Sequence, residues 1–110
     1  MPPAERLSVS VCRGCCCGRP SKHPDVDHAA QLLTVRDATY TVANARFWEV
    51  DCLGPCDRSN VVVVRSHGVR TWLGGILEPE VTAAVAGWVR SGAHLPPPPA
   101  LAERVFDPQP

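Results

Sequence analysis

The sequence predicts a small α/β domain with a mixed β-sheet, two helices and two cysteine-containing loops at one end of the sheet. Three observations lead to this prediction. The chain has 110 residues, a length typical of a single domain. Segments with the two-residue period of β-strands alternate with segments that have the period of an α-helix. The six cysteines lie in two short stretches, and each stretch follows an expected strand.

The first predicted strand covers residues 7–11. Three apolar residues there alternate with two serines, which is typical of a strand with one buried and one polar face. The strand leads directly into Cys12. The stretch from Cys12 to Pro24 contains two glycines and two prolines, so we expect it to be a loop.

A helix and a second strand are expected after this loop. The buried face of the helix would consist of Val26, Ala29, Ala30 and Leu33. Asp25 and Asp27 would lie in its first turn, where their charge suits the positive end of the helix dipole. Residues 39–50 are rich in β-branched and aromatic side chains, and they predict a strand that ends near Asp51.

The third and fourth predicted strands form a hairpin. Residues 61–64 are four consecutive valines, which is typical of a strand that is buried on both faces. Ser66, His67 and Gly68 would form the turn, and residues 69–73 would form the returning strand.

The last predicted helix has a sequence signal at its start, an apolar stripe along one face and a sequence signal at its end. Pro79 fits the first helical position and Gly92 fits the stop. The apolar stripe between them consists of Val81, Ala84, Val85, Trp88 and Val89. Residues 96–99 are prolines and cannot continue a helix. The sequence therefore predicts a domain over residues 1–95, followed by a Pro-rich tail over residues 96–110.

The predicted order is strand, helix, strand, strand, strand, helix. This order suits a mixed sheet with helices on its faces, and a thioredoxin-like domain has the same order. The three tryptophans alternate with apolar neighbours and are expected in the core: Trp48, Trp72 and Trp88.

The composition argues against two classes of partner. Eleven Lys and Arg residues and eleven Asp and Glu residues give a formal net charge of zero. The sequence has no basic stripe of the kind that nucleic-acid-binding proteins carry, so nucleic acid is not expected as a partner. No apolar run approaches the roughly 20 residues that a membrane span needs. Residues 1–6 lack an apolar segment of the signal-peptide type, so we expect a cytoplasmic protein. In a reducing compartment, clustered cysteines are typical of metal binding or redox chemistry.

The cysteines suit a [2Fe-2S] cluster. The first loop holds Cys12, Cys15, Cys16 and Cys17, and the second holds Cys52 and Cys56. Neighbouring strands would bring the two loops to the same end of the sheet. A [2Fe-2S] cluster needs four protein ligands, usually thiolates, with two on each iron. A pair from each loop meets this requirement, but the ligand requirement leaves open which cysteine accompanies Cys12 in the first loop.

These residues resemble those of the thioredoxin-like [2Fe-2S] ferredoxins, whose relatives include the small [2Fe-2S] subunit of NADH:quinone oxidoreductase. The matching segments are Val11-Cys12, Cys17-Gly18, Val50-Asp51-Cys52-Leu53-Gly54-Pro55-Cys56-Asp57, the valine strand, Trp72-Leu73-Gly74 and the helix from Pro79 to Gly92. The resemblance implies that the cluster ligands are Cys12, Cys17, Cys52 and Cys56. Cys15 and Cys16 are additional to the family pattern, and Cys16 is the first substitute for Cys17.

The resemblance also implies a function. A protein of this kind is an electron carrier rather than an enzyme, and it transfers one electron at a time between a reductase and an acceptor. Homodimers occur in the family, so self-association is a further expectation.

Two other functions remain open from the residues alone. Cys12-Arg13-Gly14-Cys15 is a Cys-x-x-Cys motif after a first strand, which is typical of thiol-disulfide oxidoreductases. That function leaves Cys52 and Cys56 without a role. Four thiolates also suit a structural zinc ion in an interaction module, although structural zinc more often uses pairs with two intervening residues.

The other polar residues are expected mainly on the surface. The histidines are isolated from one another and are expected in turns or at the surface: His23, His28, His67 and His94. The basic residues beside the cysteine loops are expected to be solvated, or else to dock an acidic partner: Arg13, Arg19, Lys22 and Arg58. No Ser/His/Asp grouping, phosphate-binding loop or carboxylate pair stands out, so no hydrolase or transferase activity is expected.

Overall fold

The computed structural model describes residues 7–13, 18–21, 23–51 and 58–107. The elements are β1 (Leu7–Cys12), α1 (His28–Thr39), β2 (Ala45–Val50), β3 (Val62–Ser66), β4 (Val69–Leu73), α2 (Pro79–Arg90), α3 (Pro99–Ala102) and β5 (Val105–Phe106). The strands form one sheet in the order β2-β1-β3-β4-β5. Strands β1 and β2 are parallel, and the other neighbours are antiparallel, so the predicted mixed α/β sheet is confirmed.

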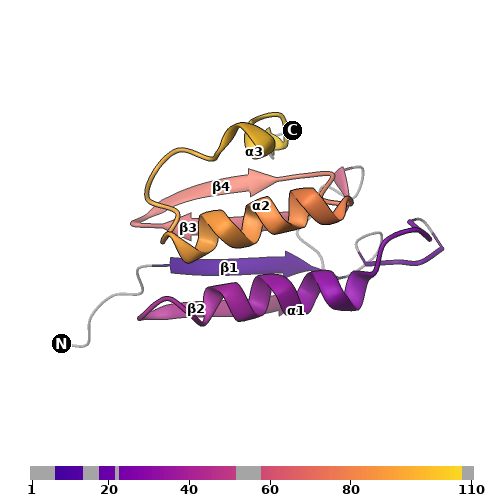
Figure 1. The fold of residues 1–110 in the computed structure, drawn as a ribbon, viewed down its shortest axis with the longest axis horizontal. Helices are drawn as coiled ribbons and strands as arrows, with labels where there is room; N and C mark the ends of the chain where they lie inside the picture. The colour runs from indigo at the N-terminus through magenta and orange to yellow at the C-terminus, as the bar shows by residue number, and fades with distance from the viewer. Residues whose placement is uncertain (1–6, 14–17, 22, 52–57, 108–110) are drawn as a thin grey trace.

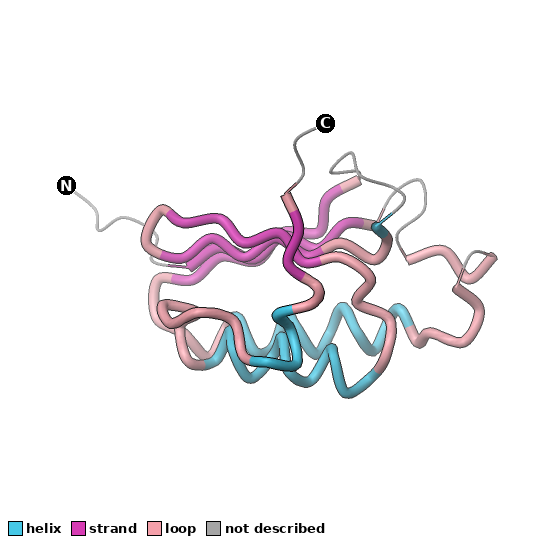
Figure 2. Tube along the Cα trace, turned by 90° about the horizontal axis from the view of Figure 1, so that it is seen from above, coloured by secondary structure: helices cyan, strands magenta, loops and turns pink. Residues whose placement is uncertain are grey.

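The described helices cover one face of the sheet. Figure 1 shows α1 and α2 side by side along the strands, and Figure 2 shows from above that both of these helices lie in one layer on the same side of the sheet. The sequence predicts helices on the faces of the sheet, and the structure places α1, α2 and α3 on one face. The opposite face has no helix over it in the described part of the chain. None of the described helices is both long enough and apolar enough to cross a membrane.

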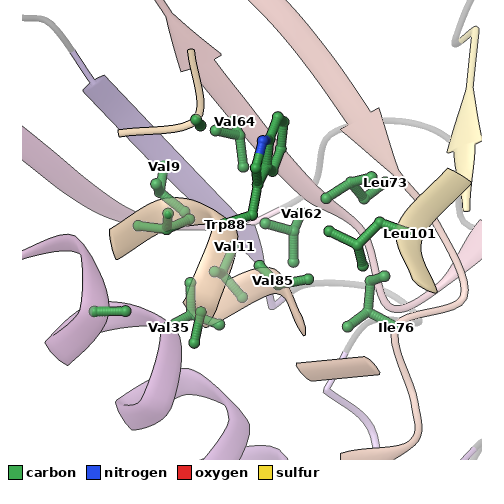
Figure 3. Close-up of a cluster of buried hydrophobic side chains, with 14 of the residues drawn as sticks. Val9, Val11, Val35, Val62, Val64, Leu73, Ile76, Val85, Trp88 and Leu101 are labelled. Atoms are coloured by element: carbon green, nitrogen blue, oxygen red, sulfur yellow. The ribbon is translucent and has the colours of Figure 1, made fainter. Parts of the chain in front are cut away.

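The main core lies between the sheet and the helices. The inward-facing side chains of β1 and β3 meet those of α1 and α2 there, as Figure 3 shows. The fully buried members include Val9, Val11, Val35, Val62, Val64, Val85 and Leu101. Burial of aliphatic side chains of this kind is the main favourable contribution to folding.

The predicted hairpin is confirmed. All four valines of residues 61–64 are buried. Val62 and Val64 belong to the core beneath the helices, whereas Val61 and Val63 pack with Cys12 on the opposite face, bordered by Trp72 and Phe106. His67 and Gly68 connect β3 to β4 with φ angles of 50° and 84°. Two consecutive residues with positive φ are the signature of the type I′ turn, whose twist matches that of the flanking strands.

The buried face of α1 differs from the prediction. The helix begins at His28 after the cap residue Asp27, whose side chain accepts a hydrogen bond from the backbone N–H of Ala30. Its buried residues are Gln31, Val35, Ala38 and Thr39. Ala29, Ala30 and Leu33 are exposed, and Val26 precedes the helix. The prediction failed because a polar residue, Gln31, occupies the centre of the buried face.

The second strand is shorter than predicted. Residues 39–44 form the end of α1 and a turn, and β2 begins only at Ala45. Thr39 Oγ1 donates to the Val35 carbonyl at 2.8 Å, and Thr41 Oγ1 donates to the Ala38 carbonyl at 2.7 Å. These β-branched residues satisfy helical carbonyls locally, which overrides their preference for strands. The predicted end of the strand is confirmed, because β2 ends at Val50.

The final predicted helix is confirmed, and two elements follow it. Helix α2 starts at Pro79, and Gly92 has a φ of 89° after its last turn. Within the predicted Pro-rich tail, α3 buries Leu101 completely and β5 pairs with β4. Residues 99–106 therefore add to both the core and the sheet.

Only one of the three tryptophans belongs to the main core. Trp88 is 7% exposed and donates from its indole N–H to the Leu95 carbonyl at 3.0 Å. Trp72 is half-buried on the opposite face of the sheet, and Trp48 is 51% exposed there. The expectation of a buried Trp48 is wrong because alternation along β2 directs its side chain away from the helices.

We expect Leu73→Ala to lower the free energy of unfolding by about 2–5 kcal/mol, because truncation of a fully buried leucine leaves a cavity. Urea denaturation followed by circular dichroism would measure this change. Leu95→Ala is the matched control, since Leu95 is 63% exposed, and its expected change is within about 0.5 kcal/mol. Equal losses in the two variants would contradict the assigned core.

Candidate metal centre

Cys12 lies where β1 and β2 end together. The parallel register runs from the pair Leu7 and Ala45 to the pair Cys12 and Val50, so both strands finish at the same end of the sheet. The backbone N–H of Cys12 donates to the Val61 carbonyl at 3.1 Å, and that of Arg13 donates to the Val50 carbonyl at 2.8 Å. The start of the first cysteine loop is thereby held between the neighbouring strands.

The sulfur of Cys12 lies against the start of the second cysteine loop. Its Sγ is 3.8 Å from the carbonyl oxygen of Asp51, the residue that precedes Cys52 in the chain. The thiol is free and 3% exposed. Thus the one cysteine that the structure describes connects both cysteine-containing stretches. Cys15, Cys16, Cys17, Cys52 and Cys56 lie outside the described residues.

The far ends of the two loops are joined as well. The backbone N–H of Gly18, which follows Cys17 in the chain, donates to Oδ1 of Asn60 at 2.8 Å. Asn60 lies four residues after Cys56 in the chain. The structure therefore brings together the described residues at both ends of both loops, as the sequence analysis expected.

Gly18 is required at its position for two reasons. Its φ is 74°, a conformation that residues with a Cβ rarely adopt. A Cβ at Gly18 would also collide with Cδ of Arg13. The glycine therefore lets the end of the first loop pack directly on the arginine at its start.

Arg13 is engaged inside the site, contrary to the expectation of a solvated charge. Its guanidinium donates to the Cys12 carbonyl at 2.9 Å, to the His28 carbonyl at 3.1 Å and to Oε1 of Gln31 at 2.9 Å. A planar guanidinium with five donors suits a position where several acceptors converge. Arg13 consequently fixes the end of β1 to the first turn of α1.

Gln31 is the centre of a buried polar network that the sequence analysis did not identify. Its Nε2 donates to the Ile76 carbonyl at 2.7 Å and to Oγ1 of Thr82 at 3.1 Å. Its Oε1 accepts from Arg13 and from Nδ2 of Asn60, the latter at 3.1 Å. The side chain is 4% exposed, and full hydrogen bonding compensates its burial. The sequence signal was its position four residues before Val35, on the buried stripe of α1.

His23 and His28 also belong to this network, whereas the sequence analysis expected turn or surface positions. Nε2 of His28 lies 3.0 Å from the His23 carbonyl, which can only accept, so Nε2 carries the proton. Nδ1 of His28 then accepts from Nδ2 of Asn60 at 3.1 Å. Nε2 of His23 lies 3.0 Å from Oγ of Ser59. Both histidines thus connect the first loop and α1 to the segment after Cys56.

The other predicted surface residues have simpler positions. His67 and His94 are exposed, as expected, with their rings 6.4 Å apart and perpendicular. Arg19 is exposed, and the guanidinium of Arg58 lies 5.2 Å from the centre of the Phe106 ring. Lys22 lies outside the described residues.

The surroundings of Cys12 suit a sulfur-ligated cluster. The side chain packs with Val61 and Val63, and partly buried apolar residues border this group: Val50, Trp72 and Phe106. Among the residues that the structure describes, no three His, Cys, Asp or Glu side chains form a group suited to a metal ion. The remaining thiols belong to segments 14–17 and 52–57, whose described ends meet beside Cys12. Thiolates are the usual ligands of iron–sulfur clusters, so this donor set fits one.

We expect Gln31→Leu to lower the free energy of unfolding by about 1–3 kcal/mol, because Arg13 and Asn60 would each lose a buried acceptor. Chemical denaturation would measure the change. Asp37→Ala is the control on the same helix, since it removes only an exposed ion pair with Arg36 and should have little effect. A Gln31→Leu protein as stable as the parent would show that the network contributes no net stability.

Comparison with known proteins identifies the fold. No protein-family model matches the sequence, and no curated protein matches it. A crystal structure of the thioredoxin-like [2Fe-2S] ferredoxin from Aquifex aeolicus matches with a TM-score of 0.60 and 21% identity, over 94% of this chain and 99% of that chain. Another structure of a thioredoxin-like [2Fe-2S] ferredoxin from Aquifex aeolicus gives a TM-score of 0.62 and 20% identity, over 97% and 96% of the two chains. The chain therefore has the fold of the thioredoxin-like [2Fe-2S] ferredoxins, as its sequence motifs predicted.

Proposed function

We propose that this protein binds one [2Fe-2S] cluster between its two cysteine loops and carries one electron at a time between a reductase and an acceptor. The observation that carries the proposal is the position of the Cys12 sulfur, 3.8 Å from the carbonyl of the residue before Cys52. The described start of one cysteine-containing stretch therefore lies against the described start of another, about 40 residues later in the chain. The matching fold of the Aquifex ferredoxin supports the same function.

The proposed ligands are Cys12, Cys17, Cys52 and Cys56. Two come from each loop, which satisfies both irons. Cys12 is held at the end of β1, because its backbone N–H donates to the Val61 carbonyl and the residue pairs with Val50 of β2. Cys17 is proposed from the spacing of the family motif, with Cys16 as its substitute.

The protein would contribute positioned ligands and a partly apolar environment. When bound, the cluster would accept and release one electron. Arg13, Asn60 and Gly18 hold the ends of the loops, so the ligands would be fixed before and after electron transfer. Val61 and Val63 limit the access of water to Cys12, and solvent exposure is one of the factors that set the reduction potential of a cluster.

The engagement of Arg13 bears on the thiol-disulfide alternative. Its guanidinium donates to the backbone carbonyls of Cys12 and His28 and to the side chain of Gln31. These contacts join β1 to α1, so they give Arg13 a role in the fold that does not depend on a reactive Cys-x-x-Cys motif. A carrier function accounts for both cysteine loops, whereas the Cys-x-x-Cys motif accounts for one. We also propose a cytoplasmic location, since a reducing compartment keeps cluster-ligating thiols from forming disulfides.

Anaerobically purified protein should be red-brown and contain about two irons and two acid-labile sulfides per chain. Its visible absorption should bleach on reduction with dithionite. Metal analysis and spectra before and after reduction would measure both properties. A colourless protein with about one zinc per chain would support the structural zinc site instead. A colourless, metal-free protein that reduces a model disulfide would support the oxidoreductase.

Single serine substitutions should separate ligands from bystanders. Cys12→Ser, Cys17→Ser, Cys52→Ser and Cys56→Ser should each lower the iron content severely or alter the visible spectrum, because each removes a proposed ligand. Cys15→Ser and Cys16→Ser are the matched controls and should retain iron and colour. If Cys16→Ser loses the cluster and Cys17→Ser keeps it, Cys16 is the fourth ligand.

A further inference from the structure

The face of the sheet opposite the helices carries a row of arginines. The strand register aligns one residue from each of four neighbouring strands, in the order Arg46, Ser8, Arg65 and Arg70. All three arginines are exposed. We call this line of residues the arginine row. It contains three positive charges and no carboxylate.

A second row lies beside the first and is mainly apolar. The same register aligns Trp48, Ser10, Val63, Trp72 and Phe106 across all five strands. We call this line the aromatic row. Trp48 is 51% exposed, and Trp72 meets Phe106 edge-to-face with ring centres 6.1 Å apart. Residues of both rows line a groove of about 370 Å³.

Two of the arginines are placed directly opposite each other. Arg65 and Arg70 are cross-strand partners in the β3–β4 ladder. Like charges in this position destabilise a sheet. Among the residues that the structure describes, no carboxylate lies within 4 Å of either guanidinium. The fold thus maintains an unfavourable pair of positive charges, which an anionic partner would relieve.

We propose that the open sheet face is the docking site for an acidic protein surface. Carboxylates of the partner would pair with Arg65 and Arg70 of the arginine row, and apolar side chains beside them would cover Trp48 and the groove. Arginine and tryptophan are the residues most enriched among those that dominate binding energy at protein interfaces. Opposite charge would also accelerate the encounter of the two proteins.

The position of Cys12 suggests which kind of protein docks here, and this step rests on the proposed cluster function. Cys12 follows Ser8 and Ser10 at two-residue spacing on β1, so it faces the same side of the sheet. Its backbone is about 7 Å along the strand from Ser10 in the aromatic row. A partner seated on the aromatic row would therefore lie next to Cys12, one of the proposed cluster ligands, as an electron donor or acceptor must.

Two other occupants fit the surface less well. A second copy of this chain using the same face would bring Arg65 and Arg70 of both copies, four arginines, into one interface, with no carboxylate in either arginine row. Single-stranded nucleic acid needs successive stacking platforms. Only Trp48 is an exposed aromatic residue in these rows, because Trp72 and Phe106 are half-buried against each other.

Fluorescence anisotropy on the full chain would test the proposal. The probe is a short fluorescein-labelled peptide of glutamates flanking a Leu-Phe pair, at low ionic strength. It should bind, and Arg65→Glu/Arg70→Glu should raise its Kd by about tenfold or more. Arg36→Glu/Arg90→Glu is the matched control on the helical side and should leave the Kd unchanged. Arg70→Glu alone should raise the melting temperature, because it creates an opposite-charge pair with Arg65.

Three outcomes would overturn the proposal. The peptide could fail to bind or bind equally to the charge-reversed protein. An oligothymidylate could bind more tightly than the peptide, with the same dependence on Arg65 and Arg70. Sedimentation could show a dimer that Trp48→Ala dissociates. Iron analysis of the same samples keeps the two proposals separate: an iron-free protein that binds the peptide refutes the cluster alone, and an iron-loaded protein that does not bind refutes the docking surface alone.

Discussion

The parallel pairing of β1 with β2 is the constraint on which the candidate site depends. Parallel strands finish at the same end of a sheet, whereas antiparallel neighbours would have sent the two cysteine loops to opposite ends. The pairing of Cys12 with Val50 makes both strands stop in register. Helix α1 makes this pairing geometrically feasible, because parallel neighbours need a long crossover connection. The site therefore results from the topology of the β1-α1-β2 unit.

The buried polar network converts this topology into a defined geometry. Two loops that are attached to neighbouring strands but make no hydrogen bonds of their own would retain considerable conformational entropy. Here Arg13, Gln31 and Asn60 form hydrogen bonds that join the described loop ends to α1 and to the segment before α2. Burial of such groups is costly unless every donor and acceptor is satisfied. No described buried side-chain nitrogen or oxygen lacks a partner, so the network meets that condition.

The sequence predicted the strands better than it predicted the polar parts of the molecule. The valine run, the His67-Gly68 turn and the α2 stripe each carry a local signal strong enough to define one structure. The face of α1 and the role of Arg13 depend on contacts with residues that are distant in the chain, such as Asn60 and Ile76. The spacing of Gln31 from Val35 indicates a shared helix face, but its polar character alone favours exposure. Its burial depends on partners from distant parts of the chain. The described ends of the cysteine loops lie at one end of the sheet, as predicted, because adjacent parallel strands finish at the same end.

The two faces of the sheet differ in what selects their side chains: one face packs in the core, and the other is open to solvent. Because side chains alternate along a strand, Leu7, Val9 and Val11 of β1 are buried in the core, and the intervening Ser8 and Ser10 lie on the open face. Stability alone would favour serine, threonine or mixed charges at these positions, since opposite charges stabilise cross-strand pairs. The arrangement of Arg65 opposite Arg70 runs against that preference. This cross-strand pair is unfavourable to the sheet itself, which is why we attribute its position to the acidic partner proposed for the open face.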